Sequence, residues 1–448
     1  MKPSLFWILP LPLVIGQIVT AEPPATKTTP NIVTVNMAVN QALLHSPTLK
    51  SRSEDTHAAS ARRSQANSEL FPKIDARFQG MHFTGLENTP LAPTVTIPEM
   101  YDQYSASIGA TQPIFTGGRI TAQRQGARFS EAACHANESA ATANTILQAL
   151  NAYWQWSKAV YLVESLEDAV RRTDAQTLDT RNKKEAGAAM DSDLLAAEVL
   201  LDQTKLHRDD ARRQADMARI ELNRRMRTNV PPDALPSKPI APVATPGTLE
   251  DNLACARTNR QELIALEKEV LVAESKVKME QAGSIPQVAL VARYEYGNPN
   301  IRDFPPVEEW EDDAYIGATA SWNIFDGGFT RNRVSEARIR ARQARLTFQD
   351  AEEGVCAQVE QTLLSLQHAL SKVNTAIHAE TSASRNVKVT SDLCASGMAR
   401  HSELLDAQSK LTEAAYQRIA SEADAVLAEA NFRYAVGLLT QESFNVIP

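Results

Sequence analysis

The spacing of apolar residues along the chain changes in a fixed order, and that order occurs twice. In the first round Ile74, Ala76 and Phe78 alternate with charged or polar neighbours. A polar loop and a second alternating stretch follow, and beyond Gly118 there is no proline until Pro231. Alternation is typical of strands with one apolar face, whereas a long run of helix formers is typical of helix. Each round therefore predicts a strand pair followed by long helices.

A short motif lies at each change from alternation to helix. Segment 114–118 reads Ile-Phe-Thr-Gly-Gly, and segment 324–328, which begins 210 positions later, reads Ile-Phe-Asp-Gly-Gly. Glycine reaches backbone angles that a side chain disfavours, so the motif predicts a strand-to-helix corner and marks the chain as a duplication. The expected corner residues are Phe115, Gly117, Gly118, Phe325, Gly327 and Gly328.

The repeat and a proline-rich segment together divide the chain of 448 residues. The expected divisions are a signal peptide (1–21), a first repeat (22–229), a linker (230–248) and a second repeat (249–448). Within the repeats we expect β-hairpins over 73–115 and 286–325 and helical hairpins over 119–228 and 329–436. Before the second β-hairpin, residues 249–282 read as one continuous helix.

The helical hairpins are long and carry an apolar stripe. Their turns are expected at Gly187 and Gly397, where glycine is suited to ending one helix before the next begins. The longer arm of each would reach about 100 Å at 1.5 Å per residue. Val359, Leu363 and Leu366 belong to a stripe with alternating spacings of four and three. Such a stripe packs helices side by side, so the arms need lateral partners.

The start of the chain predicts export. Lys2 is followed by an apolar stretch over 5–19 and by a small-residue cleavage site at 19–21. Beyond it no window approaches the roughly 18 uncharged apolar residues of a membrane helix. If the mature chain crosses a membrane, its strands must close into a barrel, because lipid leaves no other way to satisfy the backbone.

Composition removes several classes of function. The net charge of -8 gives no reason to expect nucleic acid binding. No phosphate-binding loop, nucleophile elbow or zinc signature occurs, so we expect neither catalysis nor a cofactor nor a metal. Four strands cannot close a barrel, since about eight is the smallest workable number. The apolar strand faces would then meet strands of other copies, or the sheet is a small soluble one packed on helices.

Taken in order, these motifs resemble the TolC-like outer-membrane efflux family, the outer-membrane factors. The resemblance rests on the paired Phe-x-Gly-Gly corners, on helices ended by Pro72 and Pro286, and on matching tip turns of the form Gly-x5-acidic-Leu. It implies an α+β membrane protein whose duplicated unit of two β-strands plus a long α-helical hairpin trimerises. The homotrimer would form a 12-stranded β-barrel in the outer-membrane lipid of a Gram-negative cell, continued by an α-helical coiled-coil tunnel through the periplasm.

The resemblance also implies partners and gating residues. A periplasmic adaptor (membrane fusion protein) and an inner-membrane pump would supply cargo and energy for efflux or type I secretion. Glu403 and Asp406 match carboxylates that ring the constriction, Asp193 matches a residue that latches neighbouring tips, and Gly187 and Gly397 match the tip turns near the adaptor. Asp193 and Glu403 also read as ordinary first-turn acids favoured by the helix dipole.

Three features at the tips leave alternatives open. Relatives place a tyrosine three residues before the second tip glycine, where this chain has Cys394, and Ala399 offers no basic latch residue. A basic run over 171–184 beside the first tip reads either as a solvated face or as an adaptor contact.

Two rival functions are a periplasmic adaptor and a coiled-coil scaffold without a pore. An adaptor would carry one hairpin flanked by compact β-domains, and a scaffold would have no use for the alternating strands.

Overall fold

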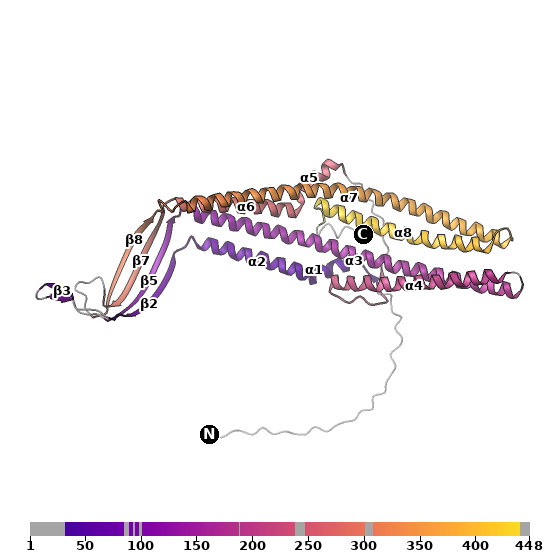
Figure 1. Cartoon of the computed structure of the whole chain (residues 1–448), viewed down its shortest axis with the longest axis horizontal. Helices are drawn as coiled ribbons and strands as arrows, with labels where there is room; N and C mark the ends of the chain where they lie inside the picture. Colours follow the sequence, from indigo (N-terminus) through magenta and orange to yellow (C-terminus); the bar gives the residue numbers. More distant parts are fainter. Residues whose placement is uncertain are drawn as a thin grey trace, which may run out of the picture.

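The computed structural model describes residues 32–84, 89–92, 95–97, 101–187, 189–237, 247–300 and 308–439. The expected signal peptide and the middle of the expected linker lie outside these residues. The described chain is elongated (Figure 1). A β-sheet lies at one end, the turns of the two helical hairpins lie at the other, and long helices run between them.

The first repeat begins with two helices and a strand pair and ends with a helical hairpin. Its main elements are α1 (Val35–His45), α2 (Pro47–Ser68), β2 (Lys73–His82), β5 (Asp102–Phe115), α3 (Arg119–Glu185) and α4 (Asp191–Met226). Two short strands, β3 (Thr89–Ala92) and β4 (Val95–Ile97), pair within the loop between β2 and β5. Another short pair, β1 (Ile32–Val33) and β6 (Leu235–Pro236), runs parallel beside the helices.

The second repeat has the same order. Its elements are α5 (Leu249–Asn259), α6 (Gln261–Gln281), a 3-10 turn η1 (Ala282–Ser284), β7 (Gln287–Asn298), β8 (Glu311–Ser321), α7 (Phe329–Ala395) and α8 (His401–Val436). Both α3 and α7 have 67 residues, and both α4 and α8 have 36. The duplicated α+β unit expected from the sequence is therefore present.

The expected continuous helix over 249–282 is wrong, because the chain breaks it at Arg260. This residue is extended, with φ -68° and ψ 112°. Its Nη1 donates to the carbonyl of Tyr434 at 2.6 Å, its Nη2 donates to Gln358 Oε1 at 2.8 Å, and its guanidinium lies 4.2 Å from the centre of the Tyr434 ring. Tertiary contacts thus hold the break. In the first repeat the corresponding break lies before Pro47, which the sequence does signal.

The second β-hairpin ends earlier than the expected residue 325. The last pair in the ladder joins Gln287, the first residue of β7, to Ser321, the last residue of β8. Because β8 has β7 as its only partner in the described sheet, residues after Ser321 have no backbone left to pair with. In the first repeat β5 lies between two strands and stays paired as far as Phe115, opposite Val288.

The four long strands form one antiparallel sheet in the order β2-β5-β7-β8. Register places Phe78 beside Ala106 and Tyr296, all on one face, where Phe78 is 83% exposed. Ile74 and Ile316 lie on the same face, and both are exposed. The opposite face carries mostly polar and charged residues. One face therefore suits an apolar surrounding, and the other suits water.

The two repeats join helix to sheet through equivalent hydrogen bonds. Gln112 Nε2 donates to the carbonyl of Leu70 at 2.9 Å, and Trp322 Nε1 donates to the carbonyl of Ser284 at 3.1 Å. Each donor lies near the end of the second strand of its repeat, and each acceptor lies just before the first. The duplication thus extends to single side-chain contacts, although the residue types differ.

The main core lies midway along the helices, where α1, α4 and α8 pack on α3. Tyr153 and Trp156 are almost fully buried there, with ring centroids 5.9 Å apart. The Tyr153 hydroxyl donates to the carbonyl of Val33 at 2.9 Å, which ties the short β1–β6 pair to this core. Burial raises the pKa of the Tyr153 hydroxyl, since the charged form loses its hydration.

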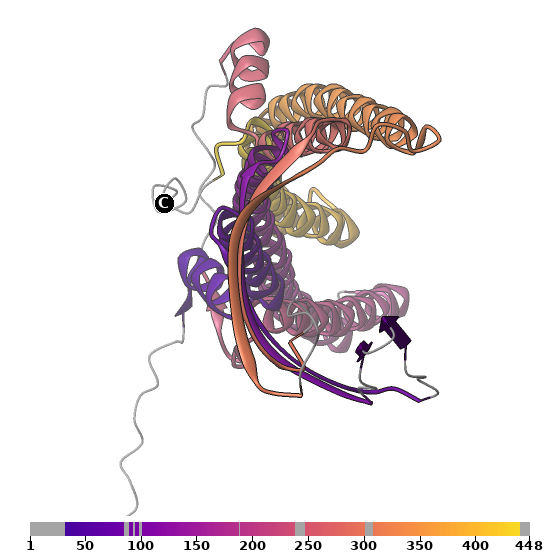
Figure 2. The same cartoon turned by 90° about the vertical axis from the view of Figure 1, so that its left-hand side faces the viewer.

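Away from this core, the molecule is a single curved layer. On the sheet side the helices neighbour one another in the order α2, α3, α6 and α7, and on the other side in the order α4, α3, α8 and α7. Viewed along the long axis, sheet and helices follow an open arc, and α5 stands outside that arc (Figure 2). Such a layer leaves two broad faces and two edges without a partner among the residues that the structure describes.

None of the described helices has an apolar stretch long enough to cross a membrane.

Candidate channel tip and strand-to-helix corners

The two hairpin tips have nearly the same backbone. Gly187 and Gly397 adopt left-handed φ angles of +74° and +72°. The Gly187 N–H donates to the Lys184 carbonyl at 2.9 Å, and the Gly397 N–H donates to the Cys394 carbonyl at 3.1 Å. A residue with a side chain would be strained at either glycine. The tip turns therefore form where the sequence indicated.

The acidic residues of the tips differ in their partners. Asp193 Oδ2 accepts the N–H of Met190 at 3.2 Å, so this carboxylate caps the start of α4. Asp406 lies 2.6 Å from the ammonium of Lys410, one turn further along α8. Glu403 and Asp406 lie three residues apart on α8, whereas Asp193 belongs to the other hairpin. No hydrogen bond or ion pair joins Asp193 to either of them among the described residues.

Cys394 occupies the position at which a latching tyrosine was expected. Its Sγ lies 3.4 Å from the carbonyl oxygen of Arg400, across the turn of its own hairpin. This contact stays within one tip. The thiol thus supports the local turn rather than a neighbouring helix in this arrangement.

The basic run beside the first tip is largely paired within its own hairpin. Arg181 lies 2.8 Å from Glu198 of α4, and Lys183 lies 2.7 Å from Asp179 of α3. Lys184 is paired with Asp191 across the turn. These contacts fit a solvated face that stabilises the hairpin, and they leave less free positive charge for an adaptor than the sequence alone indicated.

In the described part of the chain, two polar side-chain contacts connect the first hairpin to the second. Lys158 Nζ of α3 lies 2.7 Å from Asp424 Oδ1 of α8, and both are partly buried. Nearer the tips, Arg172 Nη2 donates to Thr412 Oγ1 at 2.8 Å. Sequence reasoning missed these residues, since no motif or spacing relates 158 to 424. They tie together the two hairpins that would have to separate for a tip to open.

A groove of about 430 Å³ lies between α3, α4 and α8, on the tip side of the Lys158–Asp424 pair and around the Arg172–Thr412 contact. Its wall is apolar at Leu162, Leu200 and Leu405, with Arg172 and Glu413 at its polar part. From this groove toward the tips, the two hairpins diverge (Figure 1).

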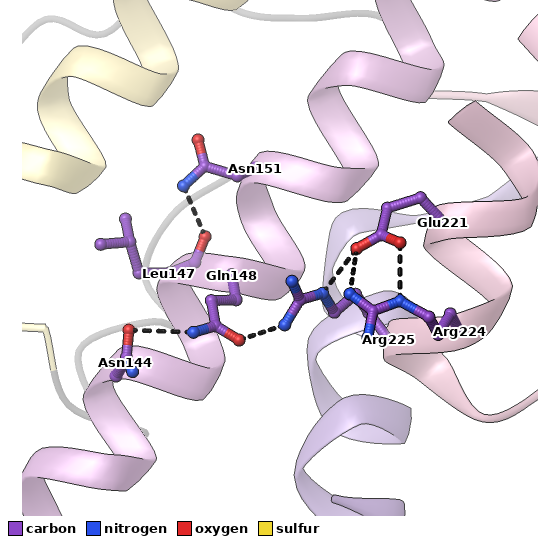
Figure 3. Close-up of polar contacts among 7 residues, drawn as sticks. All are labelled: Asn144, Leu147, Gln148, Asn151, Glu221, Arg224 and Arg225. Atoms are coloured by element: carbon purple, nitrogen blue, oxygen red, sulfur yellow. Dashed lines mark hydrogen bonds and ion pairs between the residues drawn. The ribbon is translucent and has the colours of Figure 1, made fainter. Parts of the chain in front are cut away.

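Within the first hairpin, a polar cluster links α4 to α3 by hydrogen bonds near the core (Figure 3). Glu221 accepts hydrogen bonds from Arg224 at 2.7 Å and from Arg225 at 2.8 Å, and Arg225 also bonds Gln148 of α3. These hydrogen bonds, of which the one from Arg224 has the larger effect, lower the pKa of the Glu221 carboxyl from 4.5 to about 2. The cluster therefore stays ionised at neutral pH.

The strand-to-helix corners use their glycines as expected, but unequally. Gly117 and Gly118 have φ angles of +60° and +88°, and Gly327 and Gly328 have +66° and +87°. A Cβ on Gly117 would lie 2.7 Å from Ile285 Cβ, whereas one on Gly327 would have nothing within 4 Å. The first corner is thus packed against Ile285, just before β7, whereas the second corner has open space at Gly327.

The residue before each glycine pair caps the helix. Asp326 accepts the N–H groups of Gly328 at 3.0 Å and Thr330 at 2.9 Å. A hydrogen bond from the Thr330 side chain, together with these backbone bonds, lowers the pKa of the Asp326 carboxyl. In the first repeat Thr116 Oγ1 accepts the N–H of Ile120 at 3.4 Å. Phe115 and Phe325, 50% and 87% exposed, leave both corners with an apolar surface.

These features define a class of protein: a duplicated unit that carries a one-sided apolar sheet on a long helical wall with narrow turns at the far end. The family model described as outer membrane efflux protein matches residues 38–226 and 253–438, once for each repeat. The chain belongs to this family. Outer-membrane localisation and a role in efflux, expected from the resemblance, are confirmed by that membership.

Solved structures share the fold at low sequence identity. The outer membrane protein VceC of Vibrio cholerae is 16% identical, with a TM-score of 0.77 over 90% of this chain and 96% of that one. The Campylobacter jejuni CmeC outer membrane channel is 16% identical, with a TM-score of 0.76 over 92% and 88%. The open state of the Neisseria gonorrhoeae MtrE outer membrane channel is 16% identical, with a TM-score of 0.74 over 90% and 89%. No curated protein sequence matches the chain at a significant level.

Proposed function

We propose that the protein is the outer-membrane duct of a tripartite efflux or type I secretion system. Three copies would form a passive channel through the outer membrane and the periplasm. A periplasmic adaptor would join it to an inner-membrane pump, which supplies energy and selects cargo. The observation that carries the proposal is the single curved layer (Figure 2), because its apolar sheet face and its two edges have no partner among the described residues.

The sheet supports closure by copies of itself. Within the described residues β2 and β8 each pair with one strand, and the antiparallel order makes these two edge strands run in opposite directions. The β8 of one copy can therefore pair with the β2 of the next in the same antiparallel sense. Three copies of four strands give twelve, above the smallest workable barrel of about eight. The strands have 10, 14, 12 and 11 residues, and a membrane strand needs about 9 to 11.

The helices at the edges of the layer support the same arrangement. On α4, Leu206, Met217 and Ile220 are 61%, 64% and 62% exposed. On the tip half of α7, at the other edge, Leu364, Ile377 and Val389 are 66%, 41% and 56% exposed. Side chains of this kind are normally covered, so α4 of one copy and α7 of the next would bury each other's apolar residues.

At the closed end, we propose that Glu403 and Asp406 form the constriction ring. Three copies of two carboxylates around a narrow axis would concentrate negative potential and favour cations. Lys410 offsets part of this charge, but its ion pair with Asp406 is exposed and contributes at most about 1 kcal/mol. We assign Asp193 a capping role and, beyond that, a latch between neighbouring tips. Gly187 and Gly397 would shape the surface that meets the adaptor.

Planar-bilayer recordings of the purified protein test this proposal. Changing Glu403 and Asp406 together to Ala should raise single-channel conductance severalfold and move the reversal potential toward lower cation preference. Asp174 and Asp202, exposed acids of the first hairpin, provide the matched control when both are changed to Ala. If conductance and selectivity of the Glu403 and Asp406 variant equal those of the control, the ring is elsewhere.

A further inference from the structure

The first turns of α7, just beyond the second corner, are unusually basic. Residues 329–349 contain six arginines and a single carboxylate, Glu336. Three of these arginines are paired: Arg333 with Glu280, Arg340 with Glu336, and Arg345 with Glu274. In the described part of the chain, the other three have no carboxylate partner, and all are exposed. They are Arg331, Arg338 and Arg342.

The duplication does not account for this charge. The positions equivalent to Arg331 and Arg342, 210 residues earlier, are Thr121 and Ala132. Only Arg338 has a basic counterpart, Arg128. The basic surface is therefore a property of the second corner and not of the corner fold.

Contacts further along α7 show which way this surface faces. Arg331, Arg338 and Arg345 precede Glu352 by multiples of seven residues, close to whole numbers of helical turns, so they share its face of the helix. Glu352 is bound by Arg257 of α5 at 2.9 Å, and Arg257 also contacts Cys356. Since α5 lies outside the arc in Figure 2, the arginines lie on the outer, convex side of the wall.

Next to the basic surface, on the sheet side, lie exposed apolar groups. Trp322 is 58% exposed and continues the apolar alternation of β8. Ile324, at the corner, is 79% exposed. An aromatic ring followed by cations is the arrangement found where a protein leaves the hydrocarbon layer and enters the headgroups.

Distances along the helix fit that boundary. Arg331 lies about 3 Å past the start of α7 and Arg338 about 14 Å past it, at 1.5 Å per residue. The headgroup layer is about 5 to 7 Å thick on each side of the hydrocarbon core. Arg331 would lie within it, and the flexible Arg338 side chain would reach toward it within the screening length of about 8 Å.

We propose that Arg331 and Arg338 bind anionic phospholipid headgroups of the periplasmic leaflet of the outer membrane. Guanidinium groups suit phosphate because they donate paired hydrogen bonds. The inference rests on the proposed outer-membrane placement of the sheet. It adds a lipid-binding surface that fixes the height and rotation of the second corner at the membrane boundary.

Lipid retention by the full-length protein tests the inference. The purified protein is equilibrated in mixed micelles with dioleoylphosphatidylglycerol or dioleoylphosphatidylcholine, and the lipid retained after size-exclusion chromatography is measured. We expect a preference for phosphatidylglycerol that declines at high salt. Each arginine near an anionic surface contributes about 1 kcal/mol, or about fivefold in affinity. The R331Q/R338Q variant should therefore lose most of the preference, and R331K/R338K should keep most of it.

The matched control is R385Q/K388Q, which removes two exposed charges from the tip half of the same helix and should retain lipid as the wild type does. Equal retention of both lipids by wild-type protein taken from the outer membrane would overturn the lipid inference alone. Unchanged retention by R331Q/R338Q would do the same, and would direct attention to an acidic protein partner. Absence of the wild-type chain from outer-membrane fractions would instead overturn the proposed function.

Discussion

At the level of single residues, Gly117 is constrained in a way that Gly327 is not. Both need a positive φ, which costs a side chain about 1 to 2 kcal/mol. Gly117 is also closely covered, because a Cβ there would lie 2.7 Å from Ile285 Cβ and 3.2 Å from the Ala282 carbonyl oxygen. The first corner thus has both a conformational and a packing reason for glycine.

We expect Gly117→Val to reduce the yield of folded oligomer severely, whereas Gly327→Val should lower thermal stability only modestly. The measurement is the fraction of heat-modifiable oligomer on gels together with the melting temperature. Gly354→Ala, in an open stretch of α7, serves as the control and should be neutral or slightly stabilising. Equal effects of the two corner variants would mean that the contact with Ile285 does not matter to assembly.

At the level of elements, the ties between α3 and α8 set how easily the tips separate. Lys158 and Asp424 are 18% and 36% exposed, so their ion pair is better protected from water than the surface pairs along α4. Because Lys372 of α7 also lies 3.7 Å from Asp424, one carboxylate links three helices. Movement of the second hairpin away from the first would have to break this link.

We expect Asp424→Asn and Lys158→Gln each to increase the open probability of single channels, and the double variant to add little to either. Shared dependence of this kind is what a double-mutant cycle detects. Arg213→Gln, which removes an exposed ion pair within α4, is the control and should leave gating unchanged. Additive effects of the two changes, or no effect, would argue that opening does not pass through this contact.

Much of the element order could be predicted from sequence because it depends on local signals. Alternation marked the strands, paired glycines marked the corners, and Gly187 and Gly397 marked the tips. The break at Arg260 could not be predicted, since the surrounding residues favour helix and the break depends on Tyr434, 174 positions away. The contact between Lys158 and Asp424 could not be predicted for the same reason, because it also joins residues far apart in the sequence. Asp193 shows the intermediate case, because capping was foreseen locally while its role between copies depends on assembly.

At the level of the whole molecule, the chain is a curved wall that, in the proposed assembly, becomes a duct with copies of itself. Nothing in the described residues of one chain covers the apolar sheet face, the edges of β2 and β8, or the exposed apolar residues of α4 and α7. The midway core around Tyr153 and Trp156 is packed within each copy. Cargo would pass without chemistry, along a polar inner face, and control would be exercised at the tips.

Native mass spectrometry of the protein extracted from outer membranes would show directly whether copies of the chain assemble into the proposed duct. We expect complexes of three chains, with no stable population of single folded chains, because closing the wall buries the edges of every copy. Complexes of one or two chains that retain the native fold would contradict it, since they would supply only four or eight of the twelve strands of the proposed barrel.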